Sequence, residues 1–348
     1  MRNKKIVNVG IIGAGYIAQQ CHIPAYLSNP HSKIVGVADI NEERLNEVRK
    51  RFNLQKTYLD YVELLEQNID AVSICVPTKY HSKIAIEAAS RGIHILCEKP
   101  IALTLEEADA MINSCKKNNV KLMIGFNYRF IKNHQEAKRL IEEGRIGKPF
   151  FIHGQFASQG PYENFEERRN SFYFDPRGGG GVLFDSGSHL FDLMRWFFGE
   201  VKTIYSCRGT YTEGVEVDDV AAVSLEFQNG CIGVITCMWT QIESWSAMRN
   251  EGFIKIIGSE GKVISSLFGP SLKYFSKRSK ICRIRGEIEI VPKGLDPKNP
   301  QDALQKSWRD EINAFIDAVR LNRGVPITGE DGKRALELVL KAYRLGGK

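Results

Sequence analysis

The sequence predicts an α/β Rossmann domain followed by an α+β domain with a mostly antiparallel, open sheet, and three observations support this class. The chain has 348 residues, more than a single hydrophobic core usually supports. Its first third alternates apolar strand-like runs with helical segments, which is typical of a parallel sheet covered on both faces. From Phe150 onward strand-like runs dominate, and turns such as Gln228-Asn229-Gly230 separate them, as in antiparallel hairpins.

The expected first domain covers residues 1–128 and consists of a parallel sheet with crossover helices. Its strands are expected at 6–12, 33–39, 71–76, 93–97 and 121–125, and its helices at 42–52, 84–91 and from Thr104 onward. Thr104 and Glu107 have the spacing of a capping box, which marks the start of the last of these helices. One more helix is expected at 134–143, where the pattern changes.

The expected second domain covers residues 129–307. Its strands are expected at 150–156, 201–211, 220–227, 231–239, 252–257 and 262–266, with one helix at 188–198 between them. Residues 308–348 form the closing helices, 308–321 and 330–345, which we expect to pack back on the Rossmann domain. No obvious helix covers the outer face of the second sheet. We therefore expect a homodimer or homotetramer through that sheet, with Phe227, Met238 and Trp239 as candidates on alternating faces.

Composition and charge are those of an ordinary globular protein, with 43% hydrophobic and 26% charged residues. No segment approaches the roughly 20 apolar residues that span a bilayer, and the start lacks a signal peptide's cleavage site. We expect a cytoplasmic protein without a membrane partner. The net charge is +7, but its densest basic run, residues 277–285, favours a solvated loop over a nucleic-acid surface. None of the eight cysteines forms a C-x-x-C pair, so neither a disulfide framework nor a metal site is indicated.

A glycine-rich turn follows the first expected strand. The run from Gly13 to Ala18 fits G-x-G-x-x-A and leads into a helix, whose free N–H groups suit a pyrophosphate. Asp39 ends the next strand, close to the spacing expected for an acid that accepts both ribose hydroxyls. That carboxylate repels a 2′-phosphate and favours NAD over NADP. NADP remains an alternative cofactor, because Arg44 could reach a 2′-phosphate. The alternative for Arg44 is a position on the solvent face of its helix.

Two further groups of residues suit acid–base chemistry. Glu98-Lys99-Pro100 ends a buried strand at the carboxyl edge of the sheet, which places Lys99 near the nicotinamide; the alternative is a surface pair of Lys99 with Glu98. Asp185 and His189 follow a run of glycines and are four residues apart, so a helical turn puts them on one face. The alternative there is a flexible loop with Asp185 as an N-cap.

Taken in order, these motifs resemble those of the glucose–fructose oxidoreductase / inositol dehydrogenase / rhizopine catabolism (Gfo/Idh/MocA) family. The matching pieces are Gly13-x-Gly15-x-x-Ala18, Asp39, Val76-Pro77-Thr78 with His81, Glu98-Lys99-Pro100, the run from Gly125 to Phe130, and the block from Gly179 to Asp192. The resemblance implies hydride transfer between NAD(P) and a carbinol or carbonyl carbon of a sugar, sugar nucleotide or cyclitol. It implies that Lys99, Asp185 and His189 are catalytic, with His189 as the acid–base.

The complete set of expected site residues follows from the motifs and the resemblance. The cofactor residues are Gly13, Ala14, Gly15, Tyr16, Ile17, Asp39, Arg44, Pro77, Thr78, His81, Glu98 and Lys99. The substrate residues are Lys99, Tyr128, Arg129, Arg169, Tyr173, Asp185 and His189. Structural roles remain the alternatives for His81 and Arg129, and ordinary surface positions for Arg169 and Tyr173. Asp192 is expected to be structural, and packing is the expected role of Trp239 and Trp245.

Two other functions are compatible with the same residues. One is a redox-cycling glycosidase or lyase, which uses tightly bound NAD without net oxidation. The other is a non-catalytic cofactor-binding sensor, whose signature would have been the loss of Lys99 or His189, and both are present. We expect the loops at 158–177 and 240–252 to select the substrate.

Overall fold

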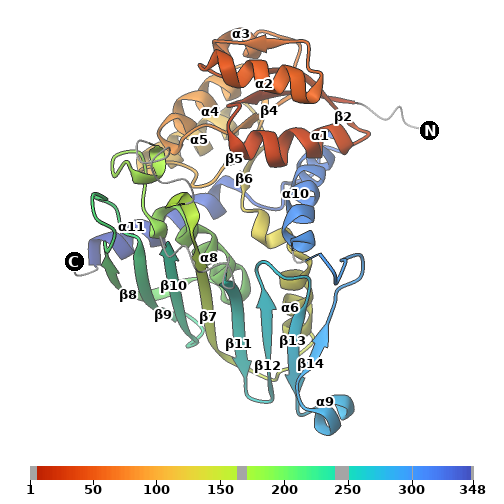
Figure 1. Cartoon of the computed structure of the whole chain (residues 1–348), viewed down its shortest axis with the longest axis vertical. Helices are drawn as coiled ribbons and strands as arrows, with labels where there is room; N and C mark the ends of the chain where they lie inside the picture. Colours follow the sequence, from red (N-terminus) through yellow and green to blue (C-terminus); the bar gives the residue numbers. More distant parts are fainter. Residues whose placement is uncertain (1–5, 163–170, 240–250, 300, 346–348) are drawn as a thin grey trace. The chain divides into compact units, whose positions relative to one another are not determined.

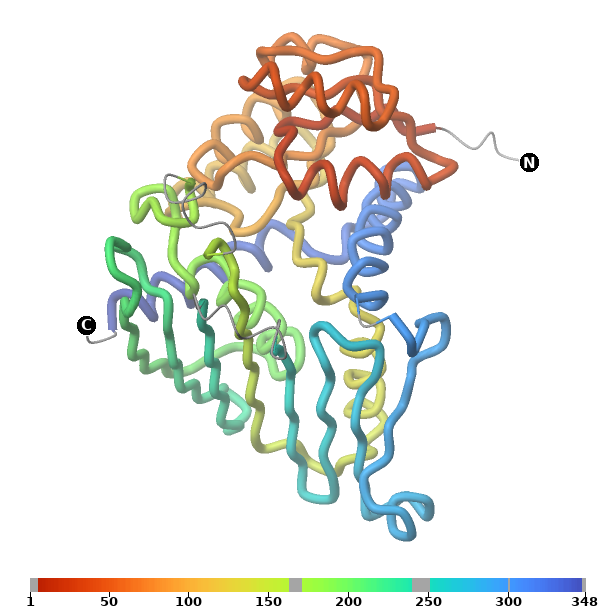
Figure 2. Tube along the Cα trace, viewed as in Figure 1, coloured from red at the N-terminus to blue at the C-terminus, as the bar shows by residue number. Residues whose placement is uncertain are grey.

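The computed structural model describes residues 6–162, 171–239, 251–299 and 301–345 (Figures 1 and 2). The chain divides into two compact units. The first, here called the nucleotide unit, contains Met1–Phe126 and Trp308–Leu336, and the second, here called the sheet unit, contains Asn127–Ser307 and Glu337–Lys348. The end of the chain thus contributes to both units. No helix in the described ranges is both long and apolar enough to cross a membrane.

The nucleotide unit is built on a six-stranded parallel sheet with the order β3-β2-β1-β4-β5-β6. The strands are β1 (Val7–Ile12), β2 (Ser32–Ala38), β3 (Thr57–Tyr58), β4 (Ala71–Ile74), β5 (His94–Glu98) and β6 (Leu122–Gly125). The order reverses between β1 and β4, and open sheets of this kind bind ligands at the carboxyl ends of the strands beside that switch point. The predicted Rossmann class is confirmed.

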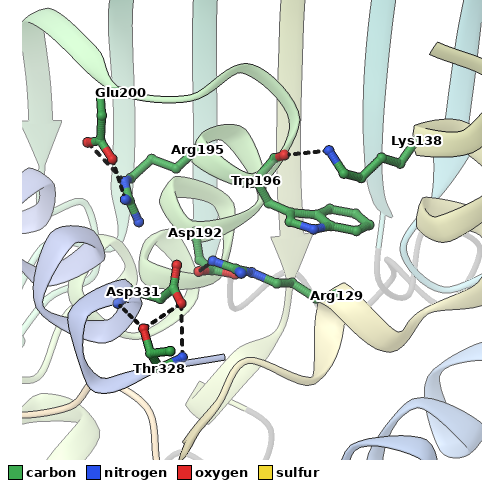
Figure 3. Close-up of polar contacts among 8 residues, drawn as sticks. All are labelled: Arg129, Lys138, Asp192, Arg195, Trp196, Glu200, Thr328 and Asp331. Carbon is green, nitrogen blue, oxygen red and sulfur yellow. Dashed lines mark hydrogen bonds and ion pairs between the residues drawn. The ribbon is translucent and has the colours of Figure 1, made fainter. Parts of the chain in front are cut away.

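Helices connect these strands and cover the sheet. They are η1 (Ala18–His22), α1 (Ile23–Ser28), α2 (Glu42–Phe52), α3 (Tyr61–Leu65), η2 (Thr78–Tyr80), α4 (His81–Ser90) and α5 (Leu105–Lys117), with most of α10 (Asp302–Arg320) and the first half of α11 (Gly329–Leu345) from the end of the chain. The predicted capping box is present at α5, where the Glu107 N–H donates to Thr104 Oγ1. A similar exchange starts α11, where the Asp331 N–H donates to Thr328 Oγ1 (Figure 3).

The sheet unit contains an eight-stranded sheet with the order β14-β13-β12-β11-β7-β10-β9-β8. The strands are β7 (Pro149–Ser158), β8 (Val201–Gly209), β9 (Val220–Phe227), β10 (Ile232–Trp239), β11 (Glu251–Gly258), β12 (Gly261–Ser266), β13 (Leu272–Ser276) and β14 (Ile288–Ile290). In the described strands, β7 and β10 form the one parallel pair and all other pairs are antiparallel. The mostly antiparallel sheet is as predicted.

One helix, α8 (Val182–Phe198), packs on β7, β9 and β10 (Figure 1). Successive side chains of a strand point to opposite faces of the sheet, so odd-numbered and even-numbered residues of one strand lie on different faces. Phe227 and Trp239 are buried on the face that α8 covers, whereas Met238 points to the opposite face and is half-buried. The helix begins at Val182, six residues before the expected start. The remaining helices of this unit are η3 (Asn127–Phe130), α6 (Lys132–Glu142), η4 (Gly160–Tyr162), η5 (Phe172–Phe174) and α9 (Lys280–Arg285).

Candidate functional site

The glycine turn after β1 has the backbone geometry that a dinucleotide site needs. Gly13 has a φ of +99°, and a Cβ at this position would lie 2.4 Å from the carbonyl oxygen of Cys75. Glycine is therefore required here by the turn itself. A Cβ on Gly15 would meet no heavy atom within 4 Å, so the main chain borders open space where a helix begins. This space suits a pyrophosphate against the first N–H groups of the helix.

The Asp39 carboxylate lies beside this turn. Its Oδ2 accepts a hydrogen bond from the Ala14 N–H (2.7 Å), and its Oδ1 accepts one from the Asn41 N–H (2.8 Å). Each oxygen has a second lone-pair direction left for a ligand donor, and the side chain is half-buried. The carboxylate is thus held in one orientation, which fits the recognition of a ribose diol. Tyr16 is 72% exposed next to the turn, and Arg44 is exposed in the first turn of α2.

The loop after β4 is tied to the turn after β5 by His81. This side chain is fully buried, with Nδ1 2.9 Å from Pro100 O and Nε2 2.8 Å from Val76 O. Burial lowers the pKa of His81, although the carbonyl oxygens oppose that shift. Both ring nitrogens face main-chain oxygens, which favours the structural alternative for this residue. Thr78 is buried and Pro77 half-buried in the same loop.

Glu98 and Lys99 stand at the carboxyl end of β5, and the Lys99–Pro100 peptide bond is cis. Glu98 is only 8% exposed, so the two residues are not the surface pair considered from the sequence. Its Oε1 lies 2.8 Å from His22 Nε2, and its Oε2 accepts a hydrogen bond from the Lys99 N–H (3.2 Å). Burial raises the pKa of Glu98, but His22 and the Lys99 charge outweigh it, so the net shift is downward.

His22 is a residue that the sequence analysis missed. It lies in the π-helical segment η1, where the Ile23 N–H bonds to the Ala18 carbonyl five residues back. Pro24 follows directly and has no N–H for the ordinary helical bond to Gln20, so a widened turn is accommodated here. The available signal was a histidine two residues before a proline inside the helix that follows the glycine turn.

In the sheet unit, α8 carries Asp185 and His189 on one face, as their spacing predicts. The His189 ring stacks on Tyr128, with centroids 4.1 Å apart and an interplanar angle of 15°. His189 is 8% exposed and Asp185 is half-buried. Burial and, to a lesser extent, the nearby Asp185 charge raise the pKa of Tyr128. Tyr128 therefore presents a neutral ring to His189.

Arg129 and Asp192 form a bidentate ion pair within the sheet unit (Figure 3). The guanidinium Nε and Nη2 lie 2.8 and 2.5 Å from the two carboxylate oxygens of Asp192, which is completely buried. Planar, two-point pairs of this kind are among the strongest charged hydrogen bonds. The geometry favours the structural alternative for Arg129, and it gives Asp192 the structural role expected for it.

The glycine-rich segment before α8 is shaped by the packing of the protein itself. A Cβ on Gly180 would lie 2.5 Å from Tyr173 O. Gly181 has a φ of +107°, and its Cβ would lie 2.4 Å from Asp218 Oδ1. Tyr173 is half-buried and meets the Trp239 ring edge-on at 6.1 Å. Trp239 is thus a packing residue, as expected, whereas Arg169 and Trp245 lie outside the described residues.

Asp218, from the segment before β9, holds the start of α8 and was also missed. Its Oδ2 accepts a hydrogen bond from the Leu183 N–H (2.9 Å) and its main-chain oxygen accepts one from the Val182 N–H (2.8 Å). The Tyr343 hydroxyl bonds to Oδ1 of the same carboxylate. Because the cap comes from a distant segment, the helix extends through residues that the sequence alone marks as a loop.

The fold and these residues define a two-domain oxidoreductase with a dinucleotide-binding Rossmann unit. Residues 7–126 match the family model described as "Oxidoreductase family, NAD-binding Rossmann fold", and residues 134–264 match the "GFO/IDH/MocA C-terminal domain". The two matches cover more than half of the chain, and the chain belongs to the Gfo/Idh/MocA family of NAD-binding oxidoreductases. The family inferred from the motifs is therefore confirmed.

Curated relatives and solved structures resemble the chain over most of its length. Myo-inositol 2-dehydrogenase of Thermotoga maritima is 28% identical over 344 residues, covering 95% of this chain and 94% of that protein. Levoglucosan dehydrogenase of Pseudarthrobacter phenanthrenivorans is 29% identical over 293 residues, covering 74% and 73%. A levoglucosan dehydrogenase solved in complex with NADH and levoglucosan has a TM-score of 0.85 and 25% identity, covering 98% of this chain and 97% of that one.

Proposed function

We propose that this protein is an NAD-dependent dehydrogenase that acts on a secondary hydroxyl of a sugar, sugar nucleotide or cyclitol. The observation that carries the proposal is the arrangement on α8, where Asp185 and His189 share one face and the His189 ring is fixed against Tyr128. The names of the relatives support the substrate class, since they are dehydrogenases of myo-inositol and of levoglucosan.

The cofactor side of the proposal rests on the nucleotide unit. The pyrophosphate would lie on the turn from Gly13 to Ile17, and Asp39 would accept the two ribose hydroxyls. Pro77, Thr78 and Lys99 would border the nicotinamide half, with Tyr16 and Arg44 at the exposed adenosine side. When bound, NAD⁺ supplies the acceptor for the hydride. The open space at Gly15 and the fixed Asp39 carboxylate fit this group.

The residues of the chain supply the proton chemistry and the orientation. An imidazole nitrogen of His189 would take the proton of the reacting hydroxyl, which is the role of a general base. Lys99 would donate a hydrogen bond to the same oxygen and stabilise its developing negative charge. Asp185, one helical turn before His189, would orient the substrate hydroxyl or the imidazole. Tyr128 and Tyr173 are further proposed contacts for the substrate, and Arg129 would act by holding η3 on α8.

The test is a screen of NAD⁺ reduction with the purified protein against a panel of sugars, cyclitols and sugar nucleotides. The proposal predicts NADH formation with at least one member, and loss of that activity in Lys99→Met. Net NADH formation separates this function from the redox-cycling alternative, in which NAD stays bound through purification and no NADH accumulates. A silent panel together with no measurable NAD binding would overturn the proposal.

We further propose that the face of the second sheet opposite α8 forms a homo-oligomer interface. Ile232, Phe151 and Ile257 lie side by side in register on that face, and Ile232 is 47% exposed. An apolar row of this kind is typical of a surface that another protein covers. Light scattering of wild type and Ile232→Glu tests this, with a smaller assembly expected for the variant. An unchanged mass would contradict the interface.

We place the protein in the cytoplasm. All eight cysteines are free thiols and all of them except Cys207 are buried. Burial raises the pKa of several of these thiols, Cys115 to about 12, which keeps them protonated and unreactive. Free thiols of this kind fit a reducing compartment.

A further inference from the structure

A chain of buried polar groups leads through the nucleotide unit to the segment that carries Lys99. The Tyr26 hydroxyl lies 2.7 Å from Ser73 Oγ, which lies 3.2 Å from His22 Nδ1. The opposite ring nitrogen, Nε2, lies 2.8 Å from Glu98 Oε1. All four side chains are buried. These four hydrogen-bonded side chains join the first helical segment of the unit to β4 and β5.

The donors along this chain have one consistent order when the imidazole is neutral. An ionised carboxylate only accepts hydrogen bonds, so His22 Nε2 carries the proton that is donated to Glu98. The other nitrogen, Nδ1, then accepts from the Ser73 hydroxyl. Ser73 in turn accepts from the Tyr26 hydroxyl. Each donor among these four side chains thereby has an acceptor, and the neutral ring of His22 is fixed in one tautomer and one orientation.

The far end of the chain fixes Glu98. One carboxylate oxygen accepts from His22, and the other accepts from the Lys99 N–H at 3.2 Å. Gly125 of β6 leaves room for the carboxylate, because a Cβ there would lie 3.2 Å from Oε1. The downward shift of the Glu98 pKa agrees with a carboxylate that stays charged at this buried position. A carboxylate without these partners would be costly to bury.

We propose that His22 is a positioning residue: through its hydrogen bond to Glu98 it holds the end of β5, and with it the backbone of Lys99. The catalytic part of this inference rests on the proposed function, in which Lys99 contacts the reacting oxygen. His22 itself touches neither substrate nor cofactor in this proposal. Its effect reaches the reaction by way of the Glu98 carboxylate and the Lys99 N–H.

Two substitutions separate this role from a general packing role. In His22→Gln the side-chain amide retains an N–H donor near the position of Nε2, toward Glu98. In His22→Asn the shorter amide reaches the position of Nδ1, toward Ser73, and leaves Glu98 without its donor. Both variants lose the ring and are polar, so a packing role predicts the same result for both. His134→Gln, at a buried histidine that bonds to Ser265 in the sheet unit, is the control for loss of a buried imidazole.

The first readout needs no activity. Hydrogen exchange of the Lys99 amide, measured by NMR on the protein without cofactor, should be roughly fivefold faster in His22→Asn than in wild type. That factor corresponds to the loss of about one ordinary hydrogen bond. Exchange should stay near the wild-type rate in His22→Gln and in His134→Gln. Equal exchange in the Asn and Gln variants would overturn the inference, whatever the enzyme's activity.

The second readout is turnover on a substrate identified by the panel screen. His22→Asn should lower kcat at least about tenfold, because small displacements of a catalytic group have large effects on rate. The Kd for NAD, which depends mainly on Gly13, Gly15 and Asp39, should change less than about threefold. His22→Gln should restore kcat to within roughly threefold of wild type. A changed exchange rate in His22→Asn, with a wild type that neither turns over any panel member nor binds NAD, would support the positioning role and contradict the proposed function, so the two failures are distinguishable.

Discussion

The imidazole of His189 lies face to face with the phenol ring of Tyr128, with ring centroids 4.1 Å apart and an interplanar angle of 15°. Tyr128 belongs to η3, directly after the first unit's last strand, and His189 lies 61 residues later in α8 (189 − 128 = 61). The stack removes the rotational freedom of the ring that we propose as the base. It also links the position of α8 to that of η3, which the Arg129–Asp192 pair reinforces.

Removal of the stacking ring should therefore slow the reaction. We expect Tyr128→Ala to lower kcat roughly tenfold or more, because His189 is no longer held in one orientation. In Tyr128→Phe the ring remains, so kcat should fall less, and a rise in KM would report the loss of a hydroxyl contact to substrate. Steady-state kinetics on both variants check this. Wild-type kcat in Tyr128→Ala would contradict a role for the stack.

The two glycines of the turn should respond in opposite ways to alanine. Gly13→Ala should destabilise the protein by at least about 1–3 kcal/mol, because its φ of +99° is strained for other residues and its Cβ would meet Cys75 O at 2.4 Å. Gly15→Ala should fold with nearly wild-type stability, since its Cβ enters open space, but bind NAD more weakly. Urea unfolding and NAD titration of both variants check this. Unimpaired NAD binding in Gly15→Ala would contradict the phosphate site.

The preference for NAD should depend on the Asp39 charge. In Asp39→Asn the repulsion of a 2′-phosphate is lost, and we expect the ratio of the Kd for NADP to the Kd for NAD to fall at least about tenfold. Glu42→Gln, which removes an exposed acid in the first turn of α2, is the control and should leave the ratio unchanged. Fluorescence titrations of wild type and the two variants with NAD and with NADP measure all six constants. A wild-type protein that binds NADP tenfold more tightly than NAD would contradict this role of Asp39.

His134 should make the protein sensitive to acid. Burial lowers the pKa of His134 from 6.5 to about 3. Between these values the unfolded chain binds a proton at this residue and the folded chain does not. The free energy of unfolding should therefore fall with decreasing pH by about 1.4 kcal/mol per unit below pH 6.5, and be unaffected by this group at higher pH.

Urea unfolding at pH 6.5 and pH 5.5 for wild type and His134→Gln measures this contribution. The difference between the two pH values should be about 1 kcal/mol smaller in the variant, because half of the unfolded chains already carry a proton on this residue at pH 6.5. Parallel pH dependence in the two proteins would show that His134 takes up a proton in the folded state as readily as in the unfolded chain.

The parts of the site that were predictable depend on local sequence. The turn at Gly13 and Gly15, the capping box at Thr104 and the shared face of Asp185 and His189 each need only a few consecutive residues and one secondary-structure element. The parallel sheet was predictable for the same reason, because buried strands are apolar throughout.

The missed parts depend on partners that are far apart in the chain. His22 meets Glu98 across 76 residues, and Asp218 caps Leu183 across 35. No local pattern indicates which distant carboxylate will serve as a cap or which histidine will reach a buried acid. The early start of α8 has the same origin, because its cap is supplied by Asp218, to which the Tyr343 hydroxyl bonds, rather than by the preceding residues.

In the proposed reaction, His189 is the general base of an NAD-dependent oxidation. The most direct test is NAD⁺ reduction by wild type and His189→Asn on the best substrate of the panel, with the Kd for NAD measured in parallel. We expect a kcat roughly 10²–10⁴-fold lower in the variant, with the Kd for NAD unchanged within about threefold. Turnover close to wild type in His189→Asn would contradict it.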